Sequence, residues 1–339
     1  MDSITQATLG AAVGYAIGGP VLGRKAALWG IGLGTLPDLD VLIRFEDPVA
    51  NFTYHRSFTH SVLVLAAITP VLAAGIRRFH KLSKDASLTI TLMVLLTLVT
   101  HPLLDAFTSY GTQLLWPLTD YPFYLASISI IDPIYTLPML GAVIMALIRP
   151  RSPRSRAAVL GAIALSTAYL GWTQVLQARM TTYAEQQLAQ NDIRPDRLFV
   201  TPTLFNSLLW YVVAVEGDTI HYGFSSLLDR QDKPLNLIAT PRNEALLEDL
   251  QGSWTVDRLK WFSHGFYQAE VEDKQVVMSD LRMGLAPHFS FRFAVAPEDT
   301  KDGPLPISQR VRKPRPEGAV GWIFDRMTAK ISCASWKNC

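Results

Sequence analysis

Six apolar segments occupy the first half of the chain. Each comes near the roughly 20 apolar residues that an α-helix needs to cross the hydrocarbon core of a bilayer. The first two segments are rich in glycine, whereas residues 157–176 contain no charged side chain. We therefore predict an α-helical polytopic membrane domain of about six hydrophobic helices. The segments cover residues 4–22, 26–43, 58–76, 87–107, 128–148 and 157–176.

The pattern changes near residue 179, after which segments rich in aromatic and β-branched residues appear. Residues 210–215 are Trp-Tyr-Val-Val-Ala-Val, and the Glu216-Gly217-Asp218 that follows is typical of a hairpin turn. Several strands joined by short turns favour an antiparallel sheet. Similar strand signals recur at residues 260–267, 275–281 and 289–295.

These patterns divide the chain into three parts. Residues 1–178 form the helical membrane domain, and residues 179–300 form a β-rich antiparallel extramembrane domain. Residues 301–339 are rich in proline and charge, which predicts a loosely ordered polar tail.

The composition agrees with membrane insertion. Of the 339 residues, 49% are hydrophobic and only 18% are charged, and the mean hydropathy is +0.19. Such a chain is too apolar for an ordinary soluble protein. The net charge of +2 provides no broad basic face, so no nucleic-acid partner is expected. The first apolar segment lacks a basic region before it, so we expect no removable secretory signal.

Basic residues are concentrated in alternate loops between the apolar segments. The intervening loops contain only Arg44 and Arg56, so the positive-inside rule assigns the basic loops to the cytoplasm. The other loops and everything after residue 176 then face outward. This topology predicts a multi-pass protein of the bacterial inner membrane with a periplasmic β-rich domain. The ten basic residues are Arg24, Lys25, Arg77, Arg78, Lys81, Lys84, Arg149, Arg151, Arg154 and Arg156.

Polar groups that a membrane helix normally avoids gather near the ends of the predicted helices. In this topology they all fall on the outer face, together with Asp2, although the topology was derived from lysine and arginine alone. Ionisable groups in a membrane are costly and usually functional, which favours one shared site. The patches hold Asp38 and Asp40, then His55, Arg56, Thr59 and His60, then His101 and Asp105, and finally Asp132.

The spacing of these residues predicts a metal site. His101 and Asp105 are four residues apart and share one helix face, which allows both to bind one divalent cation. Asp38 and Asp40 flank a single residue, as two carboxylates that share or bridge metals would. The alternative is that the histidines are satisfied polar residues at helix ends and the aspartates are helix caps.

Two other interpretations of the same region stay open. A Ser-His-Asp triad using Ser57 or Ser61 would lack the Gly-x-Ser-x-Gly turn that usually carries such a serine. Arg56 either holds a phosphate or carboxylate of a substrate or extends its charged end to the membrane interface.

The motifs resemble those of a family of bacterial inner-membrane proteins described as membrane-bound metal-dependent hydrolases, also called the LexA-binding, inner-membrane-associated hydrolase family. The resemblance covers roughly the first 150 residues. It rests on residues 36–40 (Leu-Pro-Asp-Leu-Asp), 55–61 (His-Arg-Ser-Phe-Thr-His-Ser) and 101–105 (His-Pro-Leu-Leu-Asp), followed by Tyr110-Gly111-Thr112 and Leu115-Trp116-Pro117.

The resemblance implies a set of ligands and one departure. Many members have a histidine where this chain has Gln6, so one ligand is either missing or supplied by Asp2 or a carbonyl group. Arg56 and Thr59 are implied as companions of the ligands in the catalytic motif. The implied metal ligands are Asp38, Asp40, His55, His60, His101 and Asp105.

The resulting hypothesis is a metal-dependent hydrolase of the inner membrane. The mixture of histidine and aspartate is also similar to that of zinc-dependent phospholipase C and P1-type nucleases, which favours a phosphoester or lipid-like substrate at the membrane surface. Zn²⁺ is the expected cofactor, and manganese or iron also fit. Asp38 or Asp105 is either a ligand or a general base.

Two rival hypotheses remain at this level. The first is a non-catalytic metal-binding scaffold or regulatory protein. The second is a transporter, which would favour ligands near the bilayer midplane rather than at helix ends. The lipid bilayer and a small-molecule or lipid substrate are the expected partners, and the oligomeric state is left open.

Overall fold

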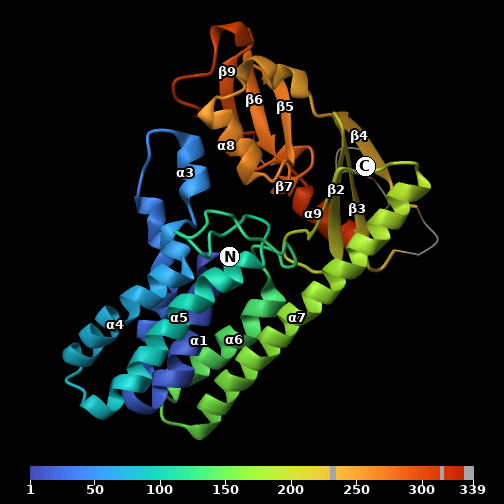
Figure 1. The fold of residues 1–339 in the computed structure, drawn as a ribbon. Coiled ribbons are helices and arrows are strands. Elements are labelled where there is room, and N and C mark those ends of the chain that lie inside the picture. Colours follow the sequence, from blue (N-terminus) through green and yellow to red (C-terminus); the bar gives the residue numbers. More distant parts are fainter. Residues whose placement is uncertain (230–233, 314–316, 332–339) are drawn as a thin grey trace. The chain divides into compact units, whose positions relative to one another are not determined.

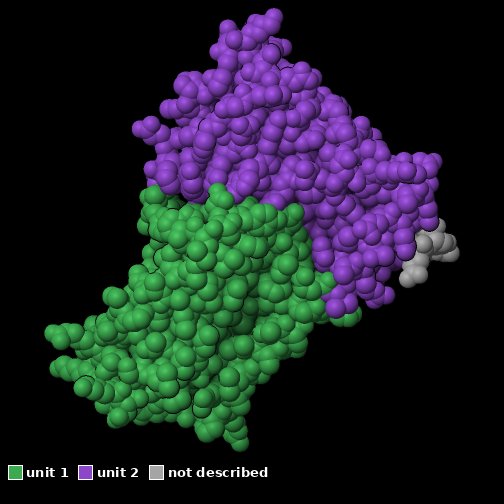
Figure 2. All heavy atoms as spheres, viewed as in Figure 1, with its two compact units in different colours: residues 1–43, 55–174 green, residues 44–54, 175–339 purple. Residues whose placement is uncertain are grey.

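The computed structural model describes residues 1–229, 234–313 and 317–331. The chain forms two compact units, coloured separately in Figure 2. Residues 1–43 and 55–174 make up the first, which we call the helical unit, and residues 44–54 and 175–339 belong to the second, the sheet unit. A helical region followed by antiparallel sheets confirms the predicted fold class at this level (Figure 1).

The helical unit contains the predicted apolar segments as helices with altered bounds. Among the described residues, three helices are long and apolar enough to cross a membrane, namely Val62–Phe79, Lys84–Ala106 and Pro153–Gln190. Pro133–Ile148 is a shorter apolar helix, so a count of six spans stays a prediction. The elements are α1 Ser3–Leu22, α2 Arg24–Thr35, η1 Pro37–Leu42, η2 Phe58–His60, α4 Val62–Phe79, η3 Lys84–Ala86, α5 Ser87–Ala106, α6 Pro133–Ile148 and α7 Pro153–Gln190.

The second predicted helix, residues 26–43, is interrupted. Helix α2 ends at Thr35, and Pro37 begins the 3₁₀ helix η1. Proline has no N–H to donate to the carbonyl four residues earlier, so the α-helical ladder cannot continue through it. The tighter turn of η1 carries Asp38 and Asp40.

Helices α1 and α2 pack closely through glycine. A Cβ atom on Gly10 would lie 2.3 Å from the Gly30 carbonyl oxygen, and one on Gly30 would lie 2.1 Å from that of Gly10. Small residues at such positions let helix backbones approach each other in membrane proteins. The Gly34 carbonyl oxygen at the end of the same helix lies 2.6 Å from His101 Nδ1 in α5. The packing of α1 and α2 therefore supports the position of His101.

We expect Gly30→Ala to destabilise the protein by about 1–3 kcal/mol, because the added methyl group meets backbone atoms that cannot rotate away. Thermal unfolding of detergent-purified protein would measure the loss. Gly32→Ala is the matched control on the same helix, since a Cβ atom there meets nothing within 4 Å. Equal destabilisation by both changes would contradict this account of the packing.

The described residues of the sheet unit form two four-stranded antiparallel sheets. Their strand orders are β1-β2-β3-β4 and β10-β9-β6-β5, and β7 pairs with β8. The last turns of α7 pack on the first sheet, where Leu176, Met180 and Ala184 contact Trp210 and Val212 in one apolar cluster. The strands are β1 Arg197–Pro202, β2 Leu209–Glu216, β3 Thr219–Ser226, β4 Leu237–Pro241, β5 Tyr267–Glu272, β6 Gln275–Asp280, β7 Gly284–Leu285, β8 His288–Phe289, β9 Arg292–Pro297 and β10 Gln309–Arg310.

The strand predictions had mixed outcomes. The hairpin is confirmed, because Glu216 pairs with Thr219 across Gly217 and Asp218. The strand predicted at residues 260–267 is wrong, since helix α8 spans Trp254–Phe262 and β5 begins only at Tyr267. The buried apolar residues of α8, Val256, Leu259 and Phe262, recur every three residues, which is close to the period of a helix and not that of a strand.

Residues 301–339, predicted as a loosely ordered tail, contain regular elements in their described part. Strand β10 pairs with β9, and helix α9 spans Ala319–Met327. Arg326 of α9 forms an ion pair with Asp229 at 2.6 Å and donates to the Phe224 carbonyl at 2.8 Å. The rest of the predicted tail, residues 314–316 and 332–339, lies outside the described residues.

Helix α3, Pro48–Tyr54, belongs to the sheet unit although its neighbours along the chain belong to the helical unit. Its Phe52 lies against an aromatic cluster, with ring centroids 4.7 Å from Phe262, 4.4 Å from Phe291 and 5.3 Å from Phe293. The Ser308 hydroxyl donates to Asp47 at 2.8 Å just before this helix. These contacts tie residues 44–54 to the sheet unit.

Truncating Phe52 to alanine should destabilise the sheet unit by about 3–5 kcal/mol, because a buried aromatic ring is lost and a cavity remains. Limited proteolysis of purified protein, with cleavage sites mapped by mass spectrometry, would detect faster opening within residues 175–339. Phe45→Ala serves as the control, since 41% of the Phe45 side chain is already exposed. Unchanged protection in Phe52→Ala would contradict the proposed role of this ring.

Candidate metal centre

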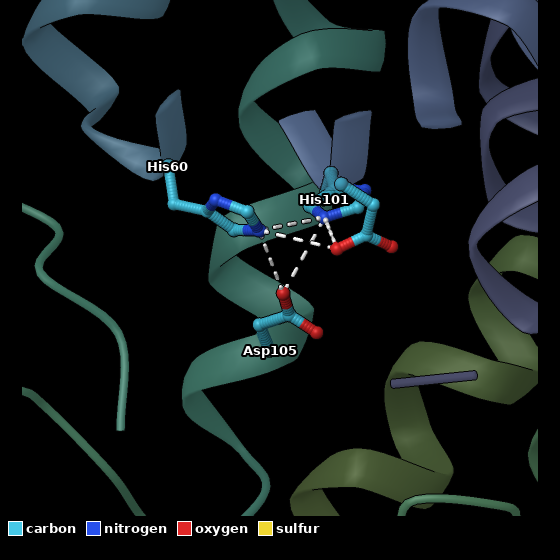
Figure 3. Close-up of side chains that lie close together, drawn as sticks. His60, His101 and Asp105 are labelled. Carbon is cyan, nitrogen blue, oxygen red and sulfur yellow. Dashed lines mark hydrogen bonds and ion pairs between the residues drawn. The ribbon is translucent and has the colours of Figure 1, made fainter. Parts of the chain in front are cut away.

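Four side chains from three elements of the helical unit converge on one point. Asp38 comes from η1, His60 ends η2, and His101 and Asp105 lie on one face of α5. One ligand atom from each residue lies within 4.8 Å of the other three, a group that can hold a metal ion. Figure 3 shows the His60 and His101 rings and the Asp105 carboxylate pointing toward one another.

The five separations that involve a histidine nitrogen are close to those of a tetrahedral site. The two Nε2 atoms of His60 and His101 are 3.1 Å apart. Asp105 Oδ2 lies 3.3 Å from His60 Nε2 and 3.4 Å from His101 Nε2, and Asp38 Oδ1 lies 3.4 and 3.5 Å from the same two atoms. Zinc bonds of about 2.0–2.2 Å in a tetrahedron separate their ligands by about 3.3–3.5 Å. The four residues therefore fit a divalent cation, whose charge the two carboxylates would balance.

Both histidines are held with Nε2 free to bind a metal. His101 Nδ1 lies 2.6 Å from the Gly34 carbonyl oxygen, which can only accept a hydrogen bond. The Thr59 hydroxyl donates to Asp40 Oδ2 at 3.0 Å and so accepts from His60 Nδ1, also at 3.0 Å. In each ring the proton is on Nδ1, and the lone pair of Nε2 points into the cluster. Metal-binding histidines are commonly oriented in this way by the hydrogen bond of their other nitrogen.

Asp40 lies beside the cluster and organises the segment that follows α3. Its Oδ1 atom is 2.8 Å from His55 Nδ1, and its Oδ2 atom accepts from the Arg56 backbone N–H at 3.0 Å and from Thr59. Arg56 has a φ of 63°, a strained backbone conformation for a residue with a side chain. Asp40 thereby holds the turn that presents His60.

This arrangement differs from the predicted ligand set. Asp38, His60, His101 and Asp105 are brought together, whereas Asp40 and His55 lie outside the group of four ligand atoms. The reason is the geometry of η1. In a 3₁₀ helix with three residues per turn, side chains two residues apart point in different directions, so Asp38 faces the cluster and Asp40 faces His55.

Asp105 is fixed from its other side by polar groups of α1 and of the His55–Ser61 segment. Its Oδ1 atom accepts from Gln6 Nε2 at 2.9 Å, lies 3.2 Å from Arg56 Nη2 and contacts the amino group of Met1. Its Oδ2 atom is buried without a hydrogen-bond partner, as is Gln6 Oε1. An unpartnered buried carboxylate oxygen that faces two imidazole nitrogens is suited to bind a metal ion.

The structure locates the residues whose roles the sequence left open. Gln6 lies at the site, where it donates a hydrogen bond to Asp105. Asp2 instead caps α1 by accepting from the Ile4 and Thr5 backbone N–H groups. Asp132 caps α6 in the same way. Ser61 caps α4 and donates to the Trp116 carbonyl at 2.5 Å, so its hydroxyl is already engaged.

Arg56 is placed to support the cluster. Only 3% of the residue is exposed, and its guanidinium donates to Thr108 at 3.2 Å and lies 4.9 Å from the centre of the Tyr110 ring. Sequence reasoning did not identify Thr108 or the Gly34 carbonyl as part of the site. The glycine spacing of α2 was the only signal for Gly34, because a carbonyl group has no side-chain signature.

The centre is buried except at Asp38. His60, His101 and Asp105 are each at most 1% exposed, whereas 21% of the Asp38 side chain is accessible. A small molecule or water would therefore reach the cluster past Asp38 and the neighbouring His55, whose side chain is 23% accessible.

Comparison with known proteins places this region in a family. Residues 1–180, which contain every residue of the cluster, match the family model described as YdjM inner membrane protein. The chain is 35% identical over 124 residues to the inner membrane protein YbcI of Escherichia coli K12, which covers 36% of this chain and 70% of that protein. It is 29% identical over 150 residues to the uncharacterized protein YfhP of Bacillus subtilis 168, covering 42% of this chain and 45% of YfhP. No solved structure matches the chain.

Proposed function

The chain belongs to the YdjM inner membrane protein family, and we propose that it is a metal-dependent hydrolase acting on a phosphoester or lipid-like substrate at the membrane surface. The observation that supports this most is the convergence of four ligand atoms, in which the two Nε2 atoms lie 3.1 Å from each other and 3.3–3.5 Å from the carboxylate oxygens of Asp38 and Asp105. Two imidazoles and two carboxylates favour Zn²⁺, and Mn²⁺ or Fe²⁺ are the alternatives.

A bound divalent cation would lower the pKa of a coordinated water and stabilise charge that develops on a substrate oxygen. In this proposal Asp38 and Asp105 are ligands and not the general base. Each presents one oxygen to the cluster, and Asp105 Oδ1 is already held by Gln6 and Arg56. Asp38, as the accessible ligand, marks the side from which a substrate approaches.

His55 and Asp40 form a pair suited to proton transfer. The carboxylate of Asp40 accepts from His55 Nδ1 at 2.8 Å, which leaves the Nε2 lone pair of His55 free to take a proton. The centre of the His55 ring is 5.8 Å from that of His60, so the pair lies beside the side chains that would hold the metal. A carboxylate that orients a histidine in this way is a recurring general-base arrangement.

The distribution of basic residues among the loops supports a location for the proposed reaction. The cluster lies at the C-terminal end of α5, away from the basic loops, so the positive-inside rule favours the periplasmic face for the site and for the sheet unit. A phosphoester or lipid-like substrate fits a metal site that opens at the bilayer surface.

The proposal is tested by incubating detergent-purified protein with bis-p-nitrophenyl phosphate and with phospholipids. Hydrolysis should require metal, stop on treatment with a chelator and return when Zn²⁺ or Mn²⁺ is added back. Asp105→Asn should abolish it. Metal-loaded protein that hydrolyses no phosphoester in such a screen would argue against the enzyme.

A non-catalytic metal scaffold is the second candidate, and the completeness of the ligand set favours it. Four protein ligands fill a tetrahedral shell, as in structural zinc sites, whereas catalytic zinc usually keeps a position for water. A catalytic role would require a position for water in addition to the four side chains. X-ray absorption spectroscopy of the bound metal separates the two, because only the catalytic site contains a water ligand.

A further inference from the structure

A second polar feature of the helical unit lies at the end away from the metal cluster. It is a cavity of about 920 Å³ between the C-terminal end of α1, the loop after α4 and the loop joining α6 to α7. These elements lie at the lowest end of the helical unit in Figure 1. From Gln6 at the cluster to Gly19 at the cavity, α1 rises by about 20 Å. The two features are therefore separate sites on one set of helices.

The wall of this cavity is divided between charge and hydrocarbon. Lys25, Arg151 and Arg156 contribute cationic groups, and Val21 and Leu160 contribute apolar ones. Val21 is 39% exposed and Leu160 48% exposed, so both remain partly accessible. Exposed aliphatic side chains next to a cationic rim match a ligand with an anionic head and an apolar tail.

A second cavity of about 630 Å³ adjoins the first. It shares Lys25 and Arg151 with it and adds Arg24 and Arg149. No acidic residue lines either cavity. Within the described ranges, none of the basic residues that line the two cavities forms an ion pair with a carboxylate. Five cationic side chains are thus gathered without a protein counter-charge.

The positive-inside rule alone accounts for basic residues in loops, but it does not require a cavity of ligand size. Ligand sites commonly measure about 300–1,000 Å³, and basic pockets between membrane helices on the cytoplasmic side bind anionic lipid headgroups. We propose that the cavity binds an anionic phospholipid, with Lys25, Arg151 and Arg156 on its phosphate and Val21 and Leu160 beside its acyl chains.

Native mass spectrometry of the full-length protein in a nonionic detergent tests this, with phosphatidylglycerol, phosphatidylcholine and inorganic phosphate as probes. We expect phosphatidylglycerol to remain bound and the other two not to. The R151Q/R156Q variant should bind phosphatidylglycerol about 25-fold more weakly, at about fivefold for each charge removed. Treatment with a metal chelator should leave lipid binding unchanged, which separates this site from the proposed hydrolase centre.

The matched control is R78Q/K84Q, which removes two charges from the same end of the helical unit but lines neither cavity. If both double variants weaken phosphatidylglycerol binding equally, the lipid is attracted by diffuse surface charge and not by a defined site. Equal binding of phosphatidylcholine would show a nonspecific apolar surface, and binding of inorganic phosphate alone would show a small-anion site. If R151Q/R156Q does not fold, Lys25→Gln carries the test, with about fivefold weaker binding expected.

Discussion

His101→Ala should remove the metal from the purified protein, and His60→Ala should do the same. We expect about one divalent ion per chain in the wild type, bound by four ligands. Even changes to residues that only orient a ligand lower metal affinity by about 10–100-fold, so loss of a ligand itself should lower it by more than about 100-fold. Inductively coupled plasma mass spectrometry on detergent-purified protein measures the metal content directly.

The control for this experiment is His80→Ala. His80 lies in the same unit and accepts a hydrogen bond from Trp29 at 2.8 Å, but it is outside the cluster. The His80→Ala variant should therefore retain the same metal content as the wild type. A wild type that carries no metal, and takes up none when zinc, manganese or iron is supplied, would remove the basis of both the hydrolase and the scaffold.

His55→Ala should retain the metal but lose hydrolytic rate. His55 lies outside the four ligand atoms, so its removal leaves the coordination shell complete. If it accepts a proton in the reaction, its loss should slow phosphoester hydrolysis by about 10²–10⁴-fold. The informative measurement is the metal content and the rate in the same preparation.

The outcomes distinguish the two roles that His55 has been given. If His55→Ala loses both the bound metal and the hydrolytic activity, His55 is a metal ligand, as its motif implied. That result would contradict the set of four ligands described above. An unchanged rate with metal retained would exclude proton transfer by His55. Thr59→Val provides a comparison, because it removes the hydroxyl that orients His60 and should lower metal affinity by about 10–100-fold while the His55–Asp40 pair stays intact.

The location of the site could be predicted from the sequence with little ambiguity. Carboxylates and imidazoles within a membrane are energetically costly and therefore stand out in the sequence. The uneven distribution of basic residues among the loops predicts that the carboxylates and imidazoles at four helix ends share one membrane face. His101 and Asp105 needed only the helical period to be placed together. Asp132 met the same criteria and is nonetheless a helix cap, because capping and metal binding use the same carboxylate at the same helix end.

The division between ligands and supporting residues could not be predicted. It depends on whether residues 37–42 form an α-helix or a 3₁₀ helix, and Pro37 decides this only together with the packing of α2 against α1 and α5. The assignment of Arg56 was undecided for a similar reason. A guanidinium that extends to the membrane interface and one that contacts a buried carboxylate have the same sequence pattern. The burial of Arg56 and its distance of 3.2 Å from Asp105 distinguish the two.

The sequence by itself determined the membrane class of the chain, the helical region and the β-rich region, and the set of polar residues from which a metal centre can be built. These properties follow from hydrophobic period and charge, which are local. The tertiary structure alone decided that α3 belongs with the sheet unit and that four of the six predicted ligands meet. These features depend on contacts between residues far apart in the chain, and such contacts set the direction in which each side chain points.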